Sequence, residues 1–332
     1  MPNKRNPRRG SMQYWPRKRA NRAFARVRSH VRGDSKNASL AGFAGYKVGM
    51  THIIVNDKSK NSLTKGMNVS MPATIIECPP LKVVGVRFYK ERADNLPGSE
   101  VVGTIMSVPD DKNIDRTLHI TKKPVGSFDN VPEYDEMRVI VHTLPARTGI
   151  GKKKPEVFEM VFSGSKEDQL AYAKEKLGKE ISLAEAVEAG AVVDVHGVTT
   201  GKGTQGPVKR FGVKVRSAKS EKTKRAPGSI AGGWKAQGHM MYRTAHTGKM
   251  GYHQRKEYNK WVLKISDDPK EVNPAGGFVR YGVVKSSYML LKGSIPGPAK
   301  RLIRMSPSVR PHNKIPKEAP DIKEISLVSR QR

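Results

Sequence analysis

The fold is decided by a stretch of β-forming sequence, AGFAGYKVGMTHIIV at residues 41–55. β-Branched and aromatic residues favour strands, whereas Gly, Pro and Asn favour the turns between them. Seven further runs of this kind, separated by such turn residues, lie at 73–89, 137–142, 156–162, 191–199, 261–265, 281–291 and 301–305. Short strands at this spacing predict a mainly β protein, built on a small barrel with insertions.

Two short helices are predicted within an α+β insertion in the barrel. Ser165 and Asp168 form a capping box at the start of a helix over residues 165–178, and a second capped helix covers residues 182–190. Residues 165–194 carry a net charge of −3. We therefore expect this helical pair to face solvent or a basic protein partner.

The composition is strongly basic. Among 332 residues, 62 are Lys or Arg and 30 are Asp or Glu, for a net charge of +32. Such an excess repels itself unless a polyanion neutralises it. Only 36% of the residues are hydrophobic, which favours one modest core with much of the chain outside it.

Several classes of protein are excluded by what the sequence lacks. The single cysteine, Cys78, rules out an internal disulfide and a cysteine metal cluster. The nine His have no metal-ligand spacing, so no metal site is expected. No run approaches the roughly 18 apolar residues of a membrane helix, and no secretory signal is evident. A membrane partner is therefore not expected.

The positive charge is concentrated in two segments. Residues 1–36 carry a net charge of +11 and residues 197–264 a net charge of +14. Lys and Arg side chains bind phosphates, while aromatic rings stack on unpaired bases. Aromatic and imidazole rings are interleaved with these charges at Trp15, Trp234, Tyr242, Tyr252 and His253. The pattern favours a nucleic-acid-binding protein over a solvated tail.

One motif suggests a dinucleotide site, because Gly201, Gly203 and Gly206 fit GxGxxG after a predicted strand. Such a site needs a helix that begins at the third glycine. Residues 207–212 are predicted to be extended, so the interpretation here is a flexible basic loop against a phosphate backbone. Lys202 is followed by Gly203 and not by Ser or Thr, which excludes a P-loop.

No constellation for catalysis is found. The basic segments contain almost no carboxylates, and no GxSxG elbow presents a nucleophile. Asp194 and His196 alternate along a predicted strand, and a structural pair is the simpler interpretation. We expect no enzyme activity, no catalytic residue, no cofactor and no small-molecule substrate.

Five ordered motifs go beyond composition: GSMQYWPRKR at 10–19, GFAGYKVGMTH at 42–52, residues 197–212 with GKGTQGPVKR, GYHQR at 251–255 and GSIPGP at 293–298. Together they closely resemble the universal ribosomal protein L3 family in its archaeal form, over nearly the whole chain. The resemblance implies a translation-protein-type β-barrel with long basic extensions. It also implies large-subunit rRNA as partner, a role in nucleating subunit assembly, and a cytoplasmic location in the large subunit.

The family also has a central finger whose tip tryptophan approaches the peptidyl transferase centre, and by order that residue is Trp234. Expected protein neighbours are the fourteenth large-subunit protein and an archaeal relative of the twenty-fourth. The residues expected to bind rRNA are Arg8, Arg9, Trp15, Arg17, Lys18, Arg19, Lys202, Lys209, Arg210, Trp234, Tyr252, His253, Arg255 and Lys256.

The expected organisation has five parts: a basic N-terminal arm at 1–40, barrel strands at 41–206 with the α+β insertion at about 91–190, a basic finger at 207–260, the remaining barrel strands at 261–305 and a C-terminal tail at 306–332. Two alternatives are a free-standing RNA-modifying enzyme with basic extensions and a DNA-compacting protein. The first needs a cofactor loop or an acid cluster, and the second needs Arg-rich helices for duplex grooves. Neither feature is present in the sequence.

Overall fold

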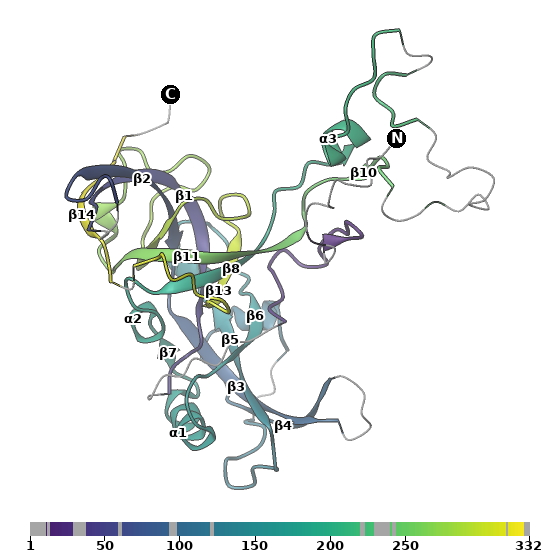
Figure 1. Cartoon of the computed structure of the whole chain (residues 1–332). Coiled ribbons are helices and arrows are strands. Elements are labelled where there is room, and N and C mark those ends of the chain that lie inside the picture. Colours follow the sequence, from purple (N-terminus) through teal and green to yellow (C-terminus); the bar gives the residue numbers. More distant parts are fainter. Residues whose placement is uncertain are drawn as a thin grey trace. The chain divides into compact units, whose positions relative to one another are not determined.

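The structure is a computed structural model, and it describes residues 11, 14–28, 38–58, 62–92, 98–119, 123–219, 223–228, 240, 244–316 and 318–328. The chain divides into two compact units (Figure 1). Unit 1 contains Met1–Ala23 and Val198–Arg255, and unit 2 contains Phe24–Gly197 and Lys256–Arg332. The predicted mainly β fold is confirmed.

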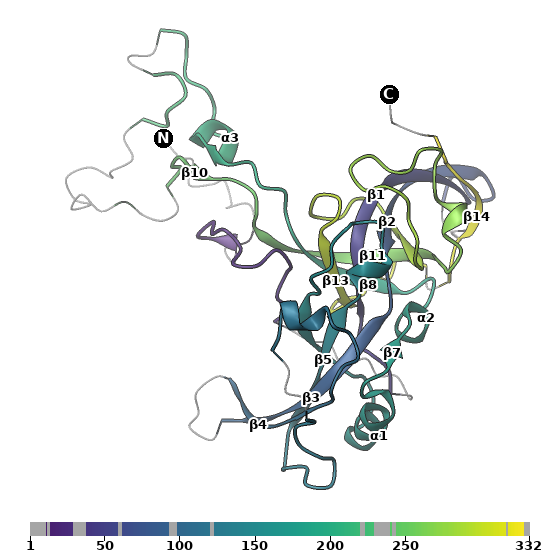
Figure 2. The same ribbon diagram turned by 180° about the vertical axis from the view of Figure 1, so that it is seen from behind.

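Unit 2 contains a closed barrel, and Figure 2 labels its strands β1, β2, β8, β11 and β13. Its strands pair in the order β13-β8-β11-β12-β2-β1, and β13 pairs again with β1 to close the circle. The strands are β1 (Phe43–Asn56), β2 (Asn68–Glu77), β8 (Val192–Val198), β11 (Gln254–Ser266), β12 (Tyr288–Lys292) and β13 (Leu302–Pro307). Closure leaves the six strands without a free edge over their paired lengths.

The edge of β1 is shared by two partners. Its first half pairs with β13, and its second half pairs with β14 (Asp321–Ile325). The sequence did not predict β14, because three of its five residues are charged and no apolar run marks it. Its Ile325 lies opposite Ile53, so the long β1 holds residues of the C-terminal region in place.

A second sheet has the order β4-β3-β5-β6, with β7 (Glu180–Ile181) also paired to β3. Its other strands are β3 (Leu81–Glu91), β4 (Ser99–Met106), β5 (Glu136–Thr143) and β6 (Val157–Val161). The single run predicted at 73–89 was wrong, because β2 ends at Glu77 and β3 begins in this other sheet. Pro79 and Pro80 lie between the two strands and cannot donate ladder hydrogen bonds.

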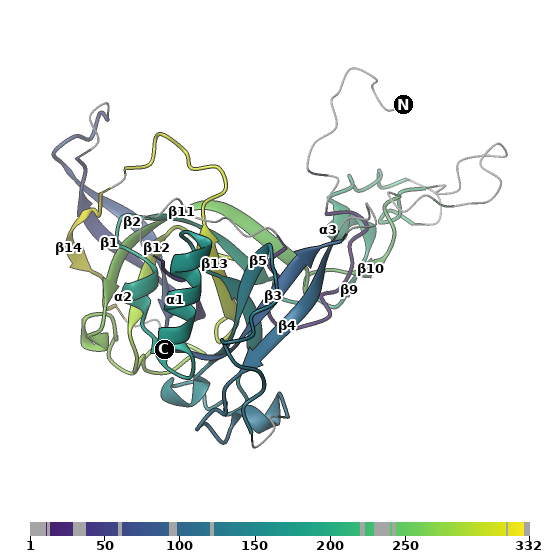
Figure 3. The same ribbon diagram turned by 90° about the horizontal axis from the view of Figure 1, so that it is seen from below.

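The two predicted helices are present, and Figure 3 views unit 2 with α1 in front. In α1 (Lys166–Lys176) the Ser165 hydroxyl accepts from the Asp168 amide at 3.2 Å. In α2 (Leu183–Ala186) the expected capping box is present, although the helix ends earlier than predicted. The described residues of unit 2 also contain three short 3-10 helices: η2 (Ile114–Arg116), η3 (Pro145–Arg147) and η5 (Pro269–Glu271).

One apolar cluster connects the barrel and the second sheet of unit 2. Its largest fully buried side chains come from both sheets and include Phe43, Tyr46, Phe88 and Tyr288. Burying each such side chain stabilises the fold by roughly 1.5–3 kcal/mol. Among the described residues, no helix is long and apolar enough to cross a membrane.

The described residues of unit 1 contain little regular structure. They include the paired strands β9 (Thr204–Gln205) and β10 (Gly248–Lys249) and the helix α3 (Pro207–Phe211). The extended chain predicted at 207–212 was wrong. Pro207 presets the first helical position and Gly212 ends the helix at φ 69°, but five residues are too few to show a helical period.

The helix α3 removes one argument against a dinucleotide-binding turn, because it does begin after Gly206. The remaining geometry still differs from that motif. The strand β9 lies inside the glycine segment, and α3 is followed by irregular chain at 212–219 with no parallel strand. A dinucleotide site needs a strand, a helix and a second strand in the same sheet.

Candidate nucleic-acid interface

Unit 1 carries most of the charge of the protein. Its sequence holds 21 Lys or Arg and one acid, Glu221, for a net charge of +20. The described part of unit 1 contains 14 of these cations and no carboxylate side chain. Its buried residues are only Val198 and His253. The described part of unit 1 therefore has neither an apolar core nor internal ion pairs with Asp or Glu to offset its repulsion.

Stacked aromatic and guanidinium groups hold the N-terminal residues to α3. The rings of Trp15 and Phe211 lie with their centroids 5.3 Å apart. The guanidinium carbon of Arg17 lies 4.2 Å from the Phe211 centroid and 5.1 Å from the Trp15 centroid. The same guanidinium donates to the Arg210 carbonyl through a short hydrogen bond. These contacts make Trp15 and Arg17 part of the packing of unit 1.

Arg210 connects α3 to the segment around β10. Its Nε donates to the Lys249 carbonyl at 3.1 Å, and its Nη1 donates to the His246 carbonyl at 3.1 Å. Its guanidinium carbon also lies 5.0 Å from the Phe211 centroid. The planar guanidinium can make such contacts on several edges at once, which an ammonium cannot do.

A third guanidinium contributes to the same electrostatic environment. Arg255 lies 4.5 Å from the Tyr14 ring centroid, and burial lowers its pKa. Burial also lowers the pKa of Arg17, and the positive charges of Arg210 and Arg255 lower it further. The three like charges destabilise one another in the absence of an anion. A phosphate bound beside them would remove that repulsion.

His253 lies inside unit 1. Its Nδ1 is 2.7 Å from the Lys18 carbonyl, and its backbone amide donates to the Thr199 hydroxyl at 3.1 Å. Burial lowers the pKa of His253, and the nearby Arg255 and Arg17 lower it further. A neutral imidazole with a protonated Nδ1 fits this site. His253 therefore joins the N-terminal residues to the glycine segment and is not placed as an open stacking surface.

The expected interface residues fall into three groups. Lys18, Arg19, Lys202 and Lys209 are exposed on unit 1. Half-buried positions are taken by Trp15, Arg17, Arg210, Tyr252 and Arg255, and the guanidinium of Arg19 lies 5.4 Å from the Tyr252 ring. Arg8, Arg9 and Trp234 lie outside the described residues.

Lys256 belongs to unit 2 and has an intramolecular partner. Its Nζ lies 3.1 Å from an oxygen of Asp194, a fully buried carboxylate. Asp194 also accepts from the backbone amides of Asn259 and Val309 at 3.0 and 3.2 Å. The charge of Lys256 thus compensates a buried acid, which the sequence did not reveal.

Two aromatic residues of the interface were not predicted from the sequence. Phe211 lies at the centre of the stack with Trp15 and Arg17, and Tyr14 lies beneath Arg255. Tyr14 could have been predicted from its position next to Trp15. For Phe211 the signal was an aromatic residue directly after a Lys-Arg pair.

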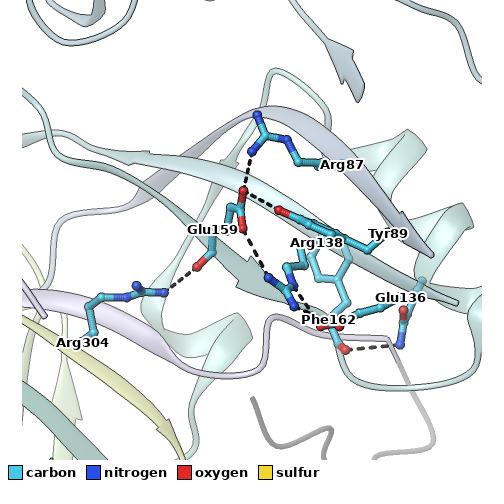
Figure 4. Close-up of polar contacts among 8 residues, drawn as sticks. Arg87, Tyr89, Glu136, Arg138, Glu159, Phe162 and Arg304 are labelled. Atoms are coloured by element: carbon cyan, nitrogen blue, oxygen red, sulfur yellow. Dashed lines mark hydrogen bonds and ion pairs between the residues drawn. The ribbon is translucent and has the colours of Figure 1, made fainter. Parts of the chain in front are cut away.

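A cluster of charged side chains in unit 2 is shown in Figure 4. Glu159 accepts from Arg87 at 2.6 Å and from the Tyr89 hydroxyl at 2.9 Å, and it lies 3.6 Å from Arg138. Arg138 also bonds both oxygens of Glu136, which raises the pKa of Arg138. Both carboxylates are held by cations, so the cluster offers no free acid or base for catalysis.

The other polar residues considered for chemistry also have structural partners. His196 Nε2 lies 3.3 Å from the Ser306 hydroxyl. Together with the contacts of Asp194, this agrees with a structural role for both side chains. Within the described ranges, no group of three or more His, Cys, Asp or Glu is placed to hold a metal ion.

Comparisons with known proteins add independent findings. The family model described as "Ribosomal protein L3" matches residues 1–123 and 110–331. The chain is 44% identical over 313 residues to the large ribosomal subunit protein uL3 of Archaeoglobus fulgidus, covering 92% of each protein. It is 41% identical over 335 residues to the uL3 protein of Methanopyrus kandleri, covering 98% of this chain and 91% of the relative. The uL3 protein of Methanothermobacter thermautotrophicus is 42% identical over 340 residues, with 98% of each covered.

Proposed function

The chain belongs to the ribosomal protein L3 family, in its archaeal type, and on that premise we propose that it is a structural constituent of the large ribosomal subunit that binds large-subunit rRNA through unit 1. The family consists of structural proteins and not of enzymes. Membership therefore removes the support for a free-standing RNA-modifying enzyme. As a component of the subunit, the protein acts in the cytoplasm.

The main support for rRNA binding is that the positive charge and the apolar core lie in different units. Unit 1 has a net charge of +20 and almost no buried residues in its described part, whereas the apolar cluster lies in unit 2. A segment of this kind cannot offset its ordering entropy and its self-repulsion by burial. Phosphates supply the missing counter-charge, and releasing their condensed cations adds a favourable entropy.

The stacked groups of unit 1 fit RNA better than duplex DNA. Within the described residues, unit 1 contains no helix longer than α3, so no long recognition helix is available for a major groove. Exposed Lys18, Arg19, Lys202 and Lys209 can meet phosphates, while Arg17 and Arg210 are preorganised by their own contacts. Irregular basic chain with aromatic groups is typical of proteins that follow folded or single-stranded RNA.

The finer parts of the proposal rest on the family resemblance. We propose that residues 207–260 form a finger with Trp234 at its tip, which reaches toward the peptidyl transferase centre. The arm at 1–40 would bind rRNA early and help nucleate assembly. The barrel strands at 41–206 and 261–305, with the insertion at about 91–190 and the tail at 306–332, would supply a rigid platform. The proposed protein neighbours are the fourteenth large-subunit protein and a relative of the twenty-fourth.

Limited proteolysis with and without large-subunit rRNA tests this proposal. We expect trypsin to cut the free protein quickly within residues 1–36 and 214–250, and to leave residues 41–55 and 281–305 in a resistant core. Bound rRNA should suppress the cuts in both basic segments. Equal cutting with and without rRNA, under conditions where binding is verified, would contradict ordering of unit 1 by RNA.

A further inference from the structure

We propose that the loop at residues 276–283 and the apolar cavity beside it bind a neighbouring protein of the large subunit, through an apolar side chain in the cavity and a carboxylate on Arg280. The inference rests on the proposed function, because it requires the protein to reside in the subunit. It concerns unit 2 alone and does not involve the basic surface of unit 1.

The loop has a fixed shape. The Phe278 amide donates to the Gly282 carbonyl at 2.8 Å, and the Gly282 amide donates back to the Phe278 carbonyl at 2.9 Å. Gly277 has φ 75°, and a Cβ there would lie 2.9 Å from the backbone of Gly282, so only glycine permits this close approach. The tight turn leaves Val279 and Arg280 at its tip.

Buried polar contacts anchor the loop to the barrel. Tyr281 is 3% exposed, and its hydroxyl makes a short hydrogen bond to the buried carboxylate of Glu77. The other Glu77 oxygen accepts from the amides of Lys285 and Ser286 at 2.7 and 2.8 Å. The loop is therefore preorganised, which lowers the ordering cost of binding a partner.

The tip retains a strained conformation in an exposed position. Arg280 adopts φ 64°, a left-handed conformation that is uncommon for residues other than glycine, and the side chain is solvent-exposed. Within the described part of the chain, the ion pairs include none with Arg280. Local strain of this kind is concentrated at functional sites. An arginine held in this way is available to a carboxylate from outside the chain.

An apolar cavity lies beside the tip. It has a volume of about 350 Å³ and is lined by Gly49–His52 of β1, Pro274, Gly277–Val279, Ser326 and Val328. Among the described residues, no Lys, Arg, Asp or Glu lines it. Val279 is 49% exposed and Val328 is 78% exposed, so apolar surface stays in contact with water at the cavity mouth. Exposed apolar surface bordered by polar residues is typical of protein-binding sites.

These features favour a protein over the other occupants. Among the described residues, the cavity lining has no Lys or Arg for a phosphate, and its rings are the half-buried Phe278 and the imidazole of His52, whereas unit 1 combines many cations with Trp and Tyr rings. In a two-fold contact centred on this loop, a second copy of the chain would bring Arg280 toward Arg280, which repel. A partner segment with a large apolar residue next to Asp or Glu satisfies both the cavity and the arginine.

Photo-crosslinking in intact large subunits tests the inference. A photoreactive amino acid replaces Val279 in one strain and, as a control, Val102 of β4 in another, since Val102 is 44% exposed elsewhere on unit 2. We expect position 279 to crosslink to one subunit protein, at a segment that contains an apolar residue beside a carboxylate. The control position should not crosslink to that segment.

The substitution Arg280→Gly, combined with the crosslinker, tests the arginine itself. Glycine adopts the same φ without strain, so the melting temperature of the free protein should be unchanged or higher. The crosslink yield should fall roughly tenfold, and Arg280→Lys should retain much of it. A crosslink to rRNA or to a second copy, no crosslink, or a yield unaffected by Arg280→Gly would overturn the inference. Absence of the wild-type protein from the subunits would instead overturn the proposed function.

Discussion

Replacement of Arg17 by alanine tests whether the stacked groups of unit 1 act in rRNA binding. Arg17 lies over the rings of Phe211 and Trp15 and donates to the Arg210 carbonyl. We expect Arg17→Ala to weaken rRNA binding and to reduce its dependence on salt. The substitution removes a charge and a packing contact at the same point.

The expected magnitude follows from these contacts. A partly exposed cation–π contact contributes about 0.5–1 kcal/mol, and a hydrogen bond from a charged donor about 1.5–3 kcal/mol. Relief of the repulsion that Arg210 and Arg255 exert on Arg17 offsets part of this loss. These contacts hold Arg17 in place before rRNA binds, so their loss is expected to reduce the free energy of binding. A net reduction of about 1–2 kcal/mol corresponds to roughly tenfold weaker binding. Losing one phosphate contact lowers the slope of log K against log salt by roughly 0.7–0.9.

The assay is equilibrium binding to large-subunit rRNA at several salt concentrations. Arg17→Lys keeps the charge but not the planar stack, so its slope should match the wild type while its affinity falls only a few-fold. Lys323→Ala removes a charge of unit 2 that is paired with Asp321, and it should change neither quantity. If Arg17→Ala had the wild-type slope, the assignment of Arg17 to a phosphate contact would be refuted.

Three further predictions concern Lys256, His253 and Trp234. Lys256→Ala leaves the buried Asp194 without its cation, so the free energy of unfolding, measured in urea, should fall by roughly 3 kcal/mol. The salt slope of rRNA binding should stay unchanged, and a changed slope in a variant of full stability would contradict this prediction. Because burial holds the pKa of His253 below its ordinary value of about 6.5, the folded state binds fewer protons than the unfolded state as the pH falls below 6.5. Thermal stability should therefore decline from pH 7 toward the folded pKa, and His253→Gln should decline less; an identical decline in both proteins would exclude His253 as the cause. Trp234→Ala removes one stacking contact of about 1–3 kcal/mol and should slow aminoacyl-tRNA entry while subunit yield stays normal; a lower yield with normal entry would contradict a tip position.

Local patterns in the sequence predicted those elements whose signals lie within a few residues of one another. The capping boxes at Ser165 and Ser182 mark the starts of α1 and α2, because a cap bonds to an amide three residues ahead. The runs at 137–142 and 156–162 became β5 and β6. By contrast, the short α3 and the charged β14 had no periodic signal and were missed.

The candidate interface was predictable in composition but not in arrangement. The sequence alone places the positive charge in two segments, because charge is a property of each residue. It does not reveal that residues 14–20 pack with α3 and the β10 segment in one unit. It also does not distinguish Lys256, which compensates a buried carboxylate, from the exposed Lys202 and Lys209.

By itself, the sequence determined that this protein is mainly β and that its positive charge is concentrated in two segments, which predicts a polyanion as its partner. These properties depend on the composition of the chain or on interactions between residues that are close together in the sequence. Only the tertiary structure decided that β13 pairs with β1 to close the barrel, that Arg17 bonds to Arg210 across 193 residues, and that Arg280 stands at the tip of an anchored loop. Such contacts depend on loop closure and on packing between distant segments, and no local pattern of residues specifies which partners meet.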